Sequence, residues 1–206
     1  METAEEIIRY LTDTYQPEAI IVYGSFADGS AGAHSDFDAL VIADHEKAHD
    51  ASRVGGVTLD VFVEPPDTFR ADYDPEAFVQ VWDGQIVLDR TGAASRLRQR
   101  VLDHIARLPP KSPEAVRQAV GWCEKMAERT GRGDAEGFYC WHWLLSDSLE
   151  IWSDAKGLPY FGPKKALRRM EREDPEAFRV YAAALREMSR ARLDAWIALL
   201  RRLAPA

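Results

Sequence analysis

The sequence predicts an α/β (α+β) domain with a small mixed sheet over residues 1–90, followed by an all-α helical bundle over residues 91–206. Short apolar, β-branched segments occur only before Arg90. After it, apolar residues recur at helical spacing and no further strand is indicated. The charge changes at the same place, from 19 acidic and 5 basic side chains in residues 1–90 to 15 acidic and 21 basic in residues 91–206. A charge difference of this size indicates two units with different roles.

The composition excludes several classes of protein. The chain has 206 residues, 46% hydrophobic and 29% charged, with a formal net charge of −8. This composition can build a hydrophobic core, and two cysteines are too few for a disulfide scaffold. No apolar run is long enough to span a bilayer, and the N-terminus is acidic, so we expect a cytoplasmic protein with no membrane partner. The acidic total also argues against a protein that coats nucleic acid.

The N-terminal elements follow from local patterns. A helix begins at Thr3, which forms a capping box with Glu6, and it ends before Pro17. Gly24 and Ser25 then open a loop of small residues. The segments with strand character are residues 19–23, 38–42, 57–63 and 85–88.

The second half has the period of helices separated by breakers. Ser112 and Pro113 are typical of a helix start, as N-cap and first-turn residues. Gly157 and Pro175 mark later breaks. The predicted helices cover residues 93–108, 113–130, 134–156, 163–172 and 175–203, which together predict an antiparallel bundle.

Three carboxylates are the most informative residues of the first half. Asp36 and Asp38 stand two apart at the start of a predicted strand, so their side chains project to one side while Phe37 projects to the other. Asp60 lies in an apolar strand, where a lone carboxylate is costly unless it is paired or binds a metal. If the two strands are neighbours, the three carboxylates form one cluster. Such hard oxygen ligands suit one or two Mg²⁺ ions.

Gly24 and Ser25 form the other part of this predicted site. A glycine directly after a buried strand lets the backbone approach a phosphate closely, and the Ser25 hydroxyl adds a donor. Either feature alone is common in turns. Their combination with Asp36, Asp38 and Asp60 favours phosphoryl or nucleotidyl transfer over a purely structural role.

These residues resemble the DNA-polymerase-β-like nucleotidyltransferase superfamily over about residues 17–90. With a helical second half, the chain is similar in architecture to the kanamycin, streptomycin and lincosamide nucleotidyltransferases. The resemblance implies that Asp36 and Asp38 bind Mg²⁺, that Asp60 binds the second metal or acts as base, and that Gly24 and Ser25 hold the nucleoside triphosphate. Asp28 departs from the family, many members of which carry a basic residue there.

The helical half contains candidate acceptor-binding groups on one predicted helix. We expect Trp141, Leu144, Leu145 and Trp152 to form the bundle core. The alternative is that some of the aromatic residues of this helix line a cleft where a flat acceptor stacks. The resemblance to antibiotic nucleotidyltransferases implies a carboxylate base for the acceptor hydroxyl. The candidates are Asp147 and Glu150, with His142 on the same helix and with Glu64 and Asp83 as rivals from the first half.

A basic helix follows Gly162. Lys164, Lys165, Arg168, Arg169 and Arg172 recur at helical spacing, which is usually a solvated face. The alternative is that Lys164 or Lys165 binds the triphosphate of ATP. In the first half, His34 is either a loop residue or a substrate contact near the metal.

The sequence therefore predicts a magnesium-dependent enzyme. It would transfer a nucleoside monophosphate from ATP or another nucleoside triphosphate to a hydroxyl of a small molecule, an aminoglycoside- or lincosamide-like antibiotic among the candidates. The helical half would bind the acceptor, dimerise, or both, so a homodimer is compatible with the pattern. Two alternatives stay open: an antitoxin-like nucleotidyltransferase that modifies a protein partner, and a non-catalytic nucleotide-binding module.

Overall fold

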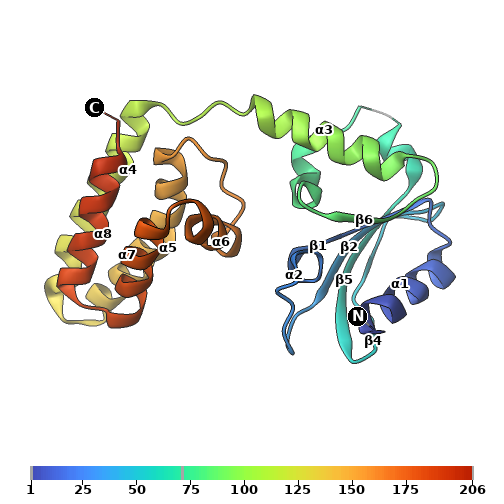
Figure 1. The fold of residues 1–206 in the computed structure, drawn as a ribbon, viewed down its shortest axis with the longest axis horizontal. Coiled ribbons are helices and arrows are strands. Elements are labelled where there is room, and N and C mark those ends of the chain that lie inside the picture. The colour runs from blue at the N-terminus through green and yellow to red at the C-terminus, as the bar shows by residue number, and fades with distance from the viewer. Residues whose placement is uncertain (1, 71, 206) are drawn as a thin grey trace. The chain divides into compact units, whose positions relative to one another are not determined.

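The computed structural model describes residues 2–70 and 72–205, and the chain divides after Arg107 into two compact units (Figure 1). We call residues 1–107 the N-terminal unit and residues 108–206 the C-terminal unit. The first contains the sheet and the second contains helices, which confirms the predicted fold class. No helix among the described residues combines the length and apolarity needed to cross a bilayer.

A mixed sheet forms the centre of the N-terminal unit. Its strands are β1 (Ala19–Tyr23), β2 (Phe37–Ile42), β3 (Ala48–Asp50), β4 (Arg53–Val54), β5 (Val57–Glu64) and β6 (Gln85–Asp89). Their order is β3-β5-β2-β1-β6, with β4 also paired to β5. β2 and β5 run parallel, whereas the other pairs are antiparallel. The four predicted strands are thus present, each within one residue of its expected bounds.

Helices cover both faces of the sheet (Figure 1). On one face, α1 (Glu2–Tyr15) buries Ile7 and Leu11 against alternate residues of β2 and β5. On the other face, α3 (Ala93–Arg107) and two short 3₁₀ helices bury Leu97 and Phe78 against the remaining residues of β1 and β2. These 3₁₀ helices are η1 (Pro66–Phe69) and η2 (Pro75–Val81). The central strands are covered on both sides, as their continuous apolar runs predict.

β3 and β4, which the sequence analysis did not identify, form one arm of a hairpin with β5. Val54 pairs with Val57, so Gly55 and Gly56 alone make the turn. Both glycines have positive φ, 56° and 82°, as a two-residue type I′ hairpin turn requires. The arm from Ala48 to Val54 has no apolar alternation, which is why the periodicity did not indicate it.

α3 belongs to the N-terminal unit, and the compact units divide at Arg107 rather than near residue 90. The helix buries Leu97 and Val101 in the core of the sheet domain. Because α3 is rich in arginine, this division leaves a net charge of −11 on the N-terminal unit and +3 on the C-terminal unit. The exposed segment 108–112 connects the units.

The C-terminal unit is a helical bundle. Its helices are α4 (Pro113–Arg129), α5 (Ala135–Ala155), α6 (Pro163–Glu173), α7 (Pro175–Glu187) and α8 (Arg190–Leu203), with the short η3 (Thr130–Arg132) between α4 and α5. Buried aromatic residues hold it together through polar contacts as well as packing. The Tyr181 hydroxyl donates to the carbonyl of Leu145 at 2.6 Å, and Nε1 of Trp196 donates to the Ser148 hydroxyl at 2.8 Å.

The prediction of one helix over residues 175–203 is wrong, because the chain breaks between α7 and α8. Met188 adopts a left-handed conformation, with φ 41° and ψ 39°, and Ser189 is extended. No glycine or proline marks the break, so the sequence offered no helix stop there.

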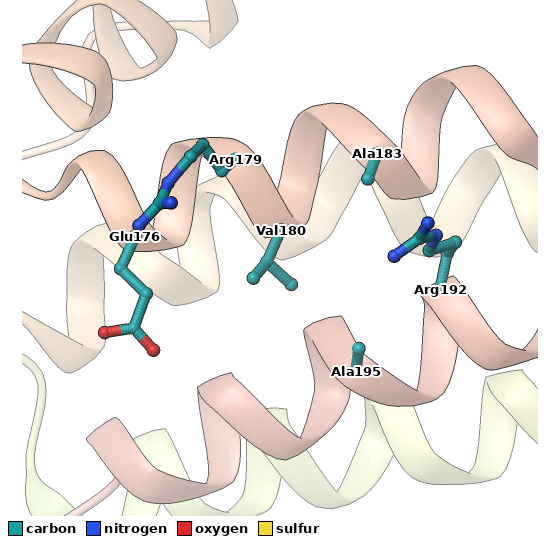
Figure 2. A pocket seen from close by; sticks show the side chains of 6 residues that line it. All are labelled: Glu176, Arg179, Val180, Ala183, Arg192 and Ala195. Carbon is teal, nitrogen blue, oxygen red and sulfur yellow. The ribbon is translucent and has the colours of Figure 1, made fainter.

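A groove of about 300 Å³ lies between α7 and α8 (Figure 2). Its lining residues are Glu176, Arg179, Val180, Ala183, Arg192 and Ala195. The charged residues at its rim already have partners within the unit: Glu176 pairs with Arg202, and Arg192 pairs with Glu187. We therefore assign no ligand to this groove.

Candidate active site

A row of polar side chains crosses three strands on the face of the sheet that α3 covers. Tyr23, the last residue of β1, pairs in register with Asp38 on β2, and Asp38 pairs with Asp60 on β5. Residues that are directly opposite on neighbouring strands project to the same face. The structure thus places Asp38 and Asp60 side by side, on the neighbouring strands that the sequence analysis assumed.

Gly24 brings the backbone against Asp38. A Cβ atom at this position would overlap a carboxylate oxygen of Asp38 and come within 3.0 Å of its Cγ, and φ is +67°. Gly24 and Ser25 begin the short helix α2 (Gly24–Asp28), where the sequence predicted a loop. Two contacts fix α2: Phe26 packs on Phe37 with ring centroids 5.1 Å apart, and the Gln85 side chain donates to the carbonyl of Ala27.

Tyr23 is a neutral partner beside the two carboxylates. Burial raises the pKa of its phenol far above the usual value, and the negative charges of Asp60 and Asp38 raise it further. A hydrogen bond with Gln80 opposes this shift but does not cancel it. The phenol therefore stays protonated over the whole working pH range, and it adds no charge to the row.

Asp36 lies just before β2 and is exposed. Among residues 2–70 and 72–205, no three His, Cys, Asp or Glu side chains are arranged so that they could hold a metal ion as they stand. The carboxylates of Asp38 and Asp60 nevertheless fit Mg²⁺ chemically. Both are half-buried hard oxygen donors, and Mg²⁺ usually takes only one or two protein carboxylates together with substrate phosphates. The assignment of Mg²⁺ to Asp36, Asp38 and Asp60 stays a prediction.

His49 on β3 is a contact of Asp60 that the sequence analysis missed. Its Nε2 lies 2.7 Å from Oδ1 of Asp60, and its ring stacks on Phe62 with centroids 4.7 Å apart. The Gly55–Gly56 turn could have revealed it, because an assigned hairpin register places His49 opposite Phe62.

The structure also places the two rival bases of the N-terminal unit. Glu64 is buried, forms an ion pair with Lys47 at 2.6 Å, and accepts a hydrogen bond from Thr68. It lies four residues from Asp60 along β5, which is roughly 13 Å. Asp83 is exposed in the turn before β6. Glu64 is therefore already paired, away from the row.

Asp147 and Glu150 lie on the exposed side of α5. Asp147 accepts a hydrogen bond of 2.6 Å from Nε1 of Trp143, whose ring also contacts Trp122. His142 is exposed on the same helix. The expected core residues are confirmed, since all four are buried: Trp141, Leu144, Leu145 and Trp152. The role of Asp147 or Glu150 as base stays a prediction.

The basic residues of α6 begin directly after Gly162. Lys164 is exposed and Lys165 is half-buried, both in the first turn of the helix. Further along, Arg169 and Arg172 both pair with Glu173, so this part of the helix is a surface ion-pair cluster. The binding of a triphosphate by Lys164 or Lys165 stays a prediction.

Asp28 is the last residue of α2, and His34 lies in the loop that follows it. Asp28 accepts a hydrogen bond from the backbone of Ser30 at 3.0 Å and so helps to turn the chain after the helix. His34 is exposed in the turn between Gly32 and Ser35. A role of His34 in substrate binding also stays a prediction.

A comparison with family models matches a segment of the N-terminal unit. Residues 5–60 match the family model described as polymerase beta, nucleotidyltransferase. A search of curated proteins gave no match. Among solved structures, a nucleotidyltransferase-like protein from Exiguobacterium sibiricum 255-15 is 16% identical with a TM-score of 0.36, and the match covers 98% of this chain and 73% of that chain. A toxin-antitoxin crystallised with AMP-PNP is 16% identical with a TM-score of 0.32, and the match covers 48% of this chain and 84% of that chain.

The family match spans most of α1, the Gly24–Ser25 turn and all three carboxylates, Asp36, Asp38 and Asp60. It thus covers the segment in which the sequence pattern and the strand register place the candidate site. Residues 5–60 of the N-terminal unit are thus similar to the polymerase-β-like nucleotidyltransferases.

Proposed function

We propose that this protein is a Mg²⁺-dependent nucleotidyltransferase that transfers AMP from ATP to a hydroxyl group of a small-molecule acceptor. The observation that carries the proposal is the register of β2 and β5, which sets Asp38 beside Asp60, with the backbone of Gly24 against Asp38. Two adjacent carboxylates repel each other, and a bound cation relieves that repulsion.

In this reaction the acceptor oxygen attacks the α-phosphorus of ATP, a P–O bond forms, and pyrophosphate leaves. Asp36, Asp38 and Asp60 would hold one or two Mg²⁺ ions, which stabilise the charge of the phosphates. Gly24 and Ser25 would hold the triphosphate. A carboxylate takes the proton of the acceptor hydroxyl, and the candidates are Asp60 in the row and Asp147 or Glu150 on α5.

The C-terminal unit would supply the acceptor contacts. Its exposed aromatic side chains include Tyr139 and Trp143, next to the carboxylate of Asp147. Such a surface suits a cyclic acceptor with hydroxyl or amino groups, such as an aminoglycoside- or lincosamide-like antibiotic. Lys164 and Lys165 would contribute charge to the binding of the triphosphate.

Pyrophosphate release is the direct test. The protein is incubated with Mg²⁺, each nucleoside triphosphate in turn, and a panel of aminoglycosides, lincosamides and small proteins. We expect release with ATP and a small-molecule acceptor, and a rate at least about 100-fold lower in Asp38→Asn. Asp44→Asn is the matched control, because Asp44 is exposed just after β2 and makes the same change of charge outside the row.

Each other outcome points to a different function. A mass increase of one nucleotide on a protein, with no small-molecule product, would favour an antitoxin-like enzyme that modifies a protein partner. Nucleotide binding without transfer to any acceptor would favour a non-catalytic module. Equal rates in Asp38→Asn and Asp44→Asn would contradict the proposed site.

A further inference from the structure

The β3–β4 arm brings a histidine to the edge of the polar row. The turn at Gly55 and Gly56 fixes the hairpin register, which continues unchanged from the pair Val54–Val57 to the pair His49–Phe62. Opposite residues share a face of the sheet, so the side chains of His49, Phe62 and Asp60 lie on the same side. This is also the side to which Asp38 projects.

The same register places Ala51 opposite Asp60. The methyl group of Ala51 is small and leaves space across from Asp60. The longer side chain of His49, two residues before Ala51, reaches Asp60 diagonally through this space. The imidazole is held by two contacts: Nε2 lies 2.7 Å from Oδ1 of Asp60, and the ring stacks on Phe62 at an interplanar angle of 22°. An ionised carboxylate only accepts hydrogen bonds, so Nε2 carries the proton and donates it.

We propose that His49 is a positioning residue that holds Asp60 for metal and nucleotide binding, an inference that rests on the proposed function. The side chains of His49 and Asp60 are 49% and 45% exposed, so close packing does not by itself fix the orientation of the carboxylate. The χ2 torsion of aspartate has a broad distribution, so the carboxylate can rotate. A hydrogen bond that holds one of its oxygens restricts this rotation. Oδ1 is then engaged by His49, which leaves Oδ2 as the oxygen for a cation.

The hydrogen bond also acts on the charge of the row. Asp38 and Asp60 are adjacent on parallel strands, so their negative charges repel each other. The N–H dipole of His49 partly offsets the negative charge of Asp60 before a ligand binds. Partners that hydrogen-bond to metal-ligating side chains typically change metal affinity by about 10- to 100-fold when they are removed.

Mn²⁺ binding tests the proposal without relying on turnover. Free Mn²⁺ is measured by electron paramagnetic resonance with the full chain, alone and with a non-hydrolysable ATP analogue. We expect the Kd for Mn²⁺ to rise about 10-fold in His49→Ala, because Asp60 loses its fixed orientation. His49→Gln, whose side-chain amide can still donate to Oδ1, should restore most of the affinity.

His45→Ala is the control, because His45 is exposed in the same unit and its Nδ1 contacts the carbonyl of Glu46 rather than a carboxylate. Thermal unfolding of each variant separates loss of binding from loss of folding. An unchanged Kd in His49→Ala, with Mn²⁺ still bound by the wild type, would overturn the positioning role alone. Loss in both His49→Ala and His49→Gln would overturn it in favour of direct ligation. Absence of binding by the folded wild type would overturn the proposed function together with this role.

Discussion

Two physical constraints favour glycine at position 24: the backbone dihedral angle φ and the space next to Cα. The φ of Gly24, +67°, lies in the region that side chains with a Cβ rarely adopt. A Cβ would also overlap the carboxylate of Asp38, so relief of the backbone strain alone would not accommodate a larger residue. A substitution at this position therefore affects both the stability of the chain and the position of Asp38.

Gly24→Ala tests this pair of constraints. We expect the free energy of unfolding to fall by about 1–2 kcal/mol, because left-handed backbone strain has that cost. Mn²⁺ binding should fall as well, since Asp38 must move. Gly32→Ala is the matched control, because Gly32 is exposed, its φ is not positive, and nothing lies within 4 Å of an added Cβ. Urea unfolding and Mn²⁺ titration of both variants measure the difference, and indistinguishable results would rule out the role of Gly24.

Local alternation was enough to predict the strand positions of the carboxylates in the candidate site, whereas contacts that depend on strand pairing were missed. Asp38 and Asp60 stand in strands that their apolar neighbours identify. Tyr23 belongs to an apolar run, and nothing local shows that its phenol will lie beside two carboxylates. His49 depends on a hairpin register, which only the Gly55–Gly56 turn indicates. A residue that acts through a neighbouring strand is hard to find from periodicity alone.

At the scale of elements, Asp50 ties the hairpin arm to α1. Its Oδ2 accepts hydrogen bonds from Tyr15 at 2.9 Å and Tyr10 at 3.2 Å, and Oδ1 accepts one from the backbone of Ser52. Burial alone would raise the pKa of Asp50, but these hydrogen bonds outweigh it and lower the pKa below its usual value. Burial, together with the contact to Asp50, raises the pKa of Tyr15 to about 12.

Asp50→Asn should lower the free energy of unfolding by about 1–2 kcal/mol at pH 7, because hydrogen bonds to a charged group are lost. An aspartate with a lowered folded-state pKa stabilises the fold above its unfolded pKa of about 3.9, and the effect disappears as the pH falls through the folded value. The difference from wild type should be constant between about pH 5 and 8 and shrink below about pH 4. Urea unfolding across this range is the measurement, with Asp44→Asn as an exposed control. A difference that grows in acid would contradict the assigned direction.

The helix end that the sequence predicted is marked by a proline, whereas the helix break that it missed is marked by no glycine or proline. The structure confirms the helix that was predicted to end before Pro17, although α1 begins at Glu2, so Thr3 lies inside the helix and is not its N-cap. The break at Met188 has no glycine, no proline and no loss of apolar period, so α7 and α8 read as one helix. Tertiary packing, which a local pattern does not contain, decides such a break.

For the molecule as a whole, α3 packs with the sheet, so the chain divides into its two units after this helix and not before it. Its apolar face carries Ala94, Leu97 and Val101, and such a face could pack on a sheet or in a bundle equally well. The helical period of the apolar residues shows that one side of the helix is buried. It does not show which hydrophobic core that side packs against. The sequence therefore showed that two kinds of architecture are present and placed their division before α3, whereas the compact units divide after it.

Limited proteolysis with trypsin should cleave first after Arg107 or Lys111. The segment 108–112 is exposed and lies between two compact units, so its backbone can enter a protease more easily than the helices can. We expect two fragments, divided near residue 110, that resist further cleavage. Mass spectrometry of the first products measures this, and initial cleavage at Lys164 or Lys165 would instead show that α6 opens before the connection.

The pairing of β2 with β5 also affects the order in which the candidate active site can form during folding. β3, β4 and β5 are joined by the tight turn at Gly55 and Gly56, and a hairpin of this kind closes within microseconds, whereas the parallel pair of β2 and β5 is non-local and slower. We expect His49 to meet Asp60 early and Asp38 to join them late. A slip of one residue in the late step would turn Asp60 to the opposite face of the sheet. If the row binds a cation as proposed, that binding would distinguish a correctly folded chain from a compact chain with the wrong strand register.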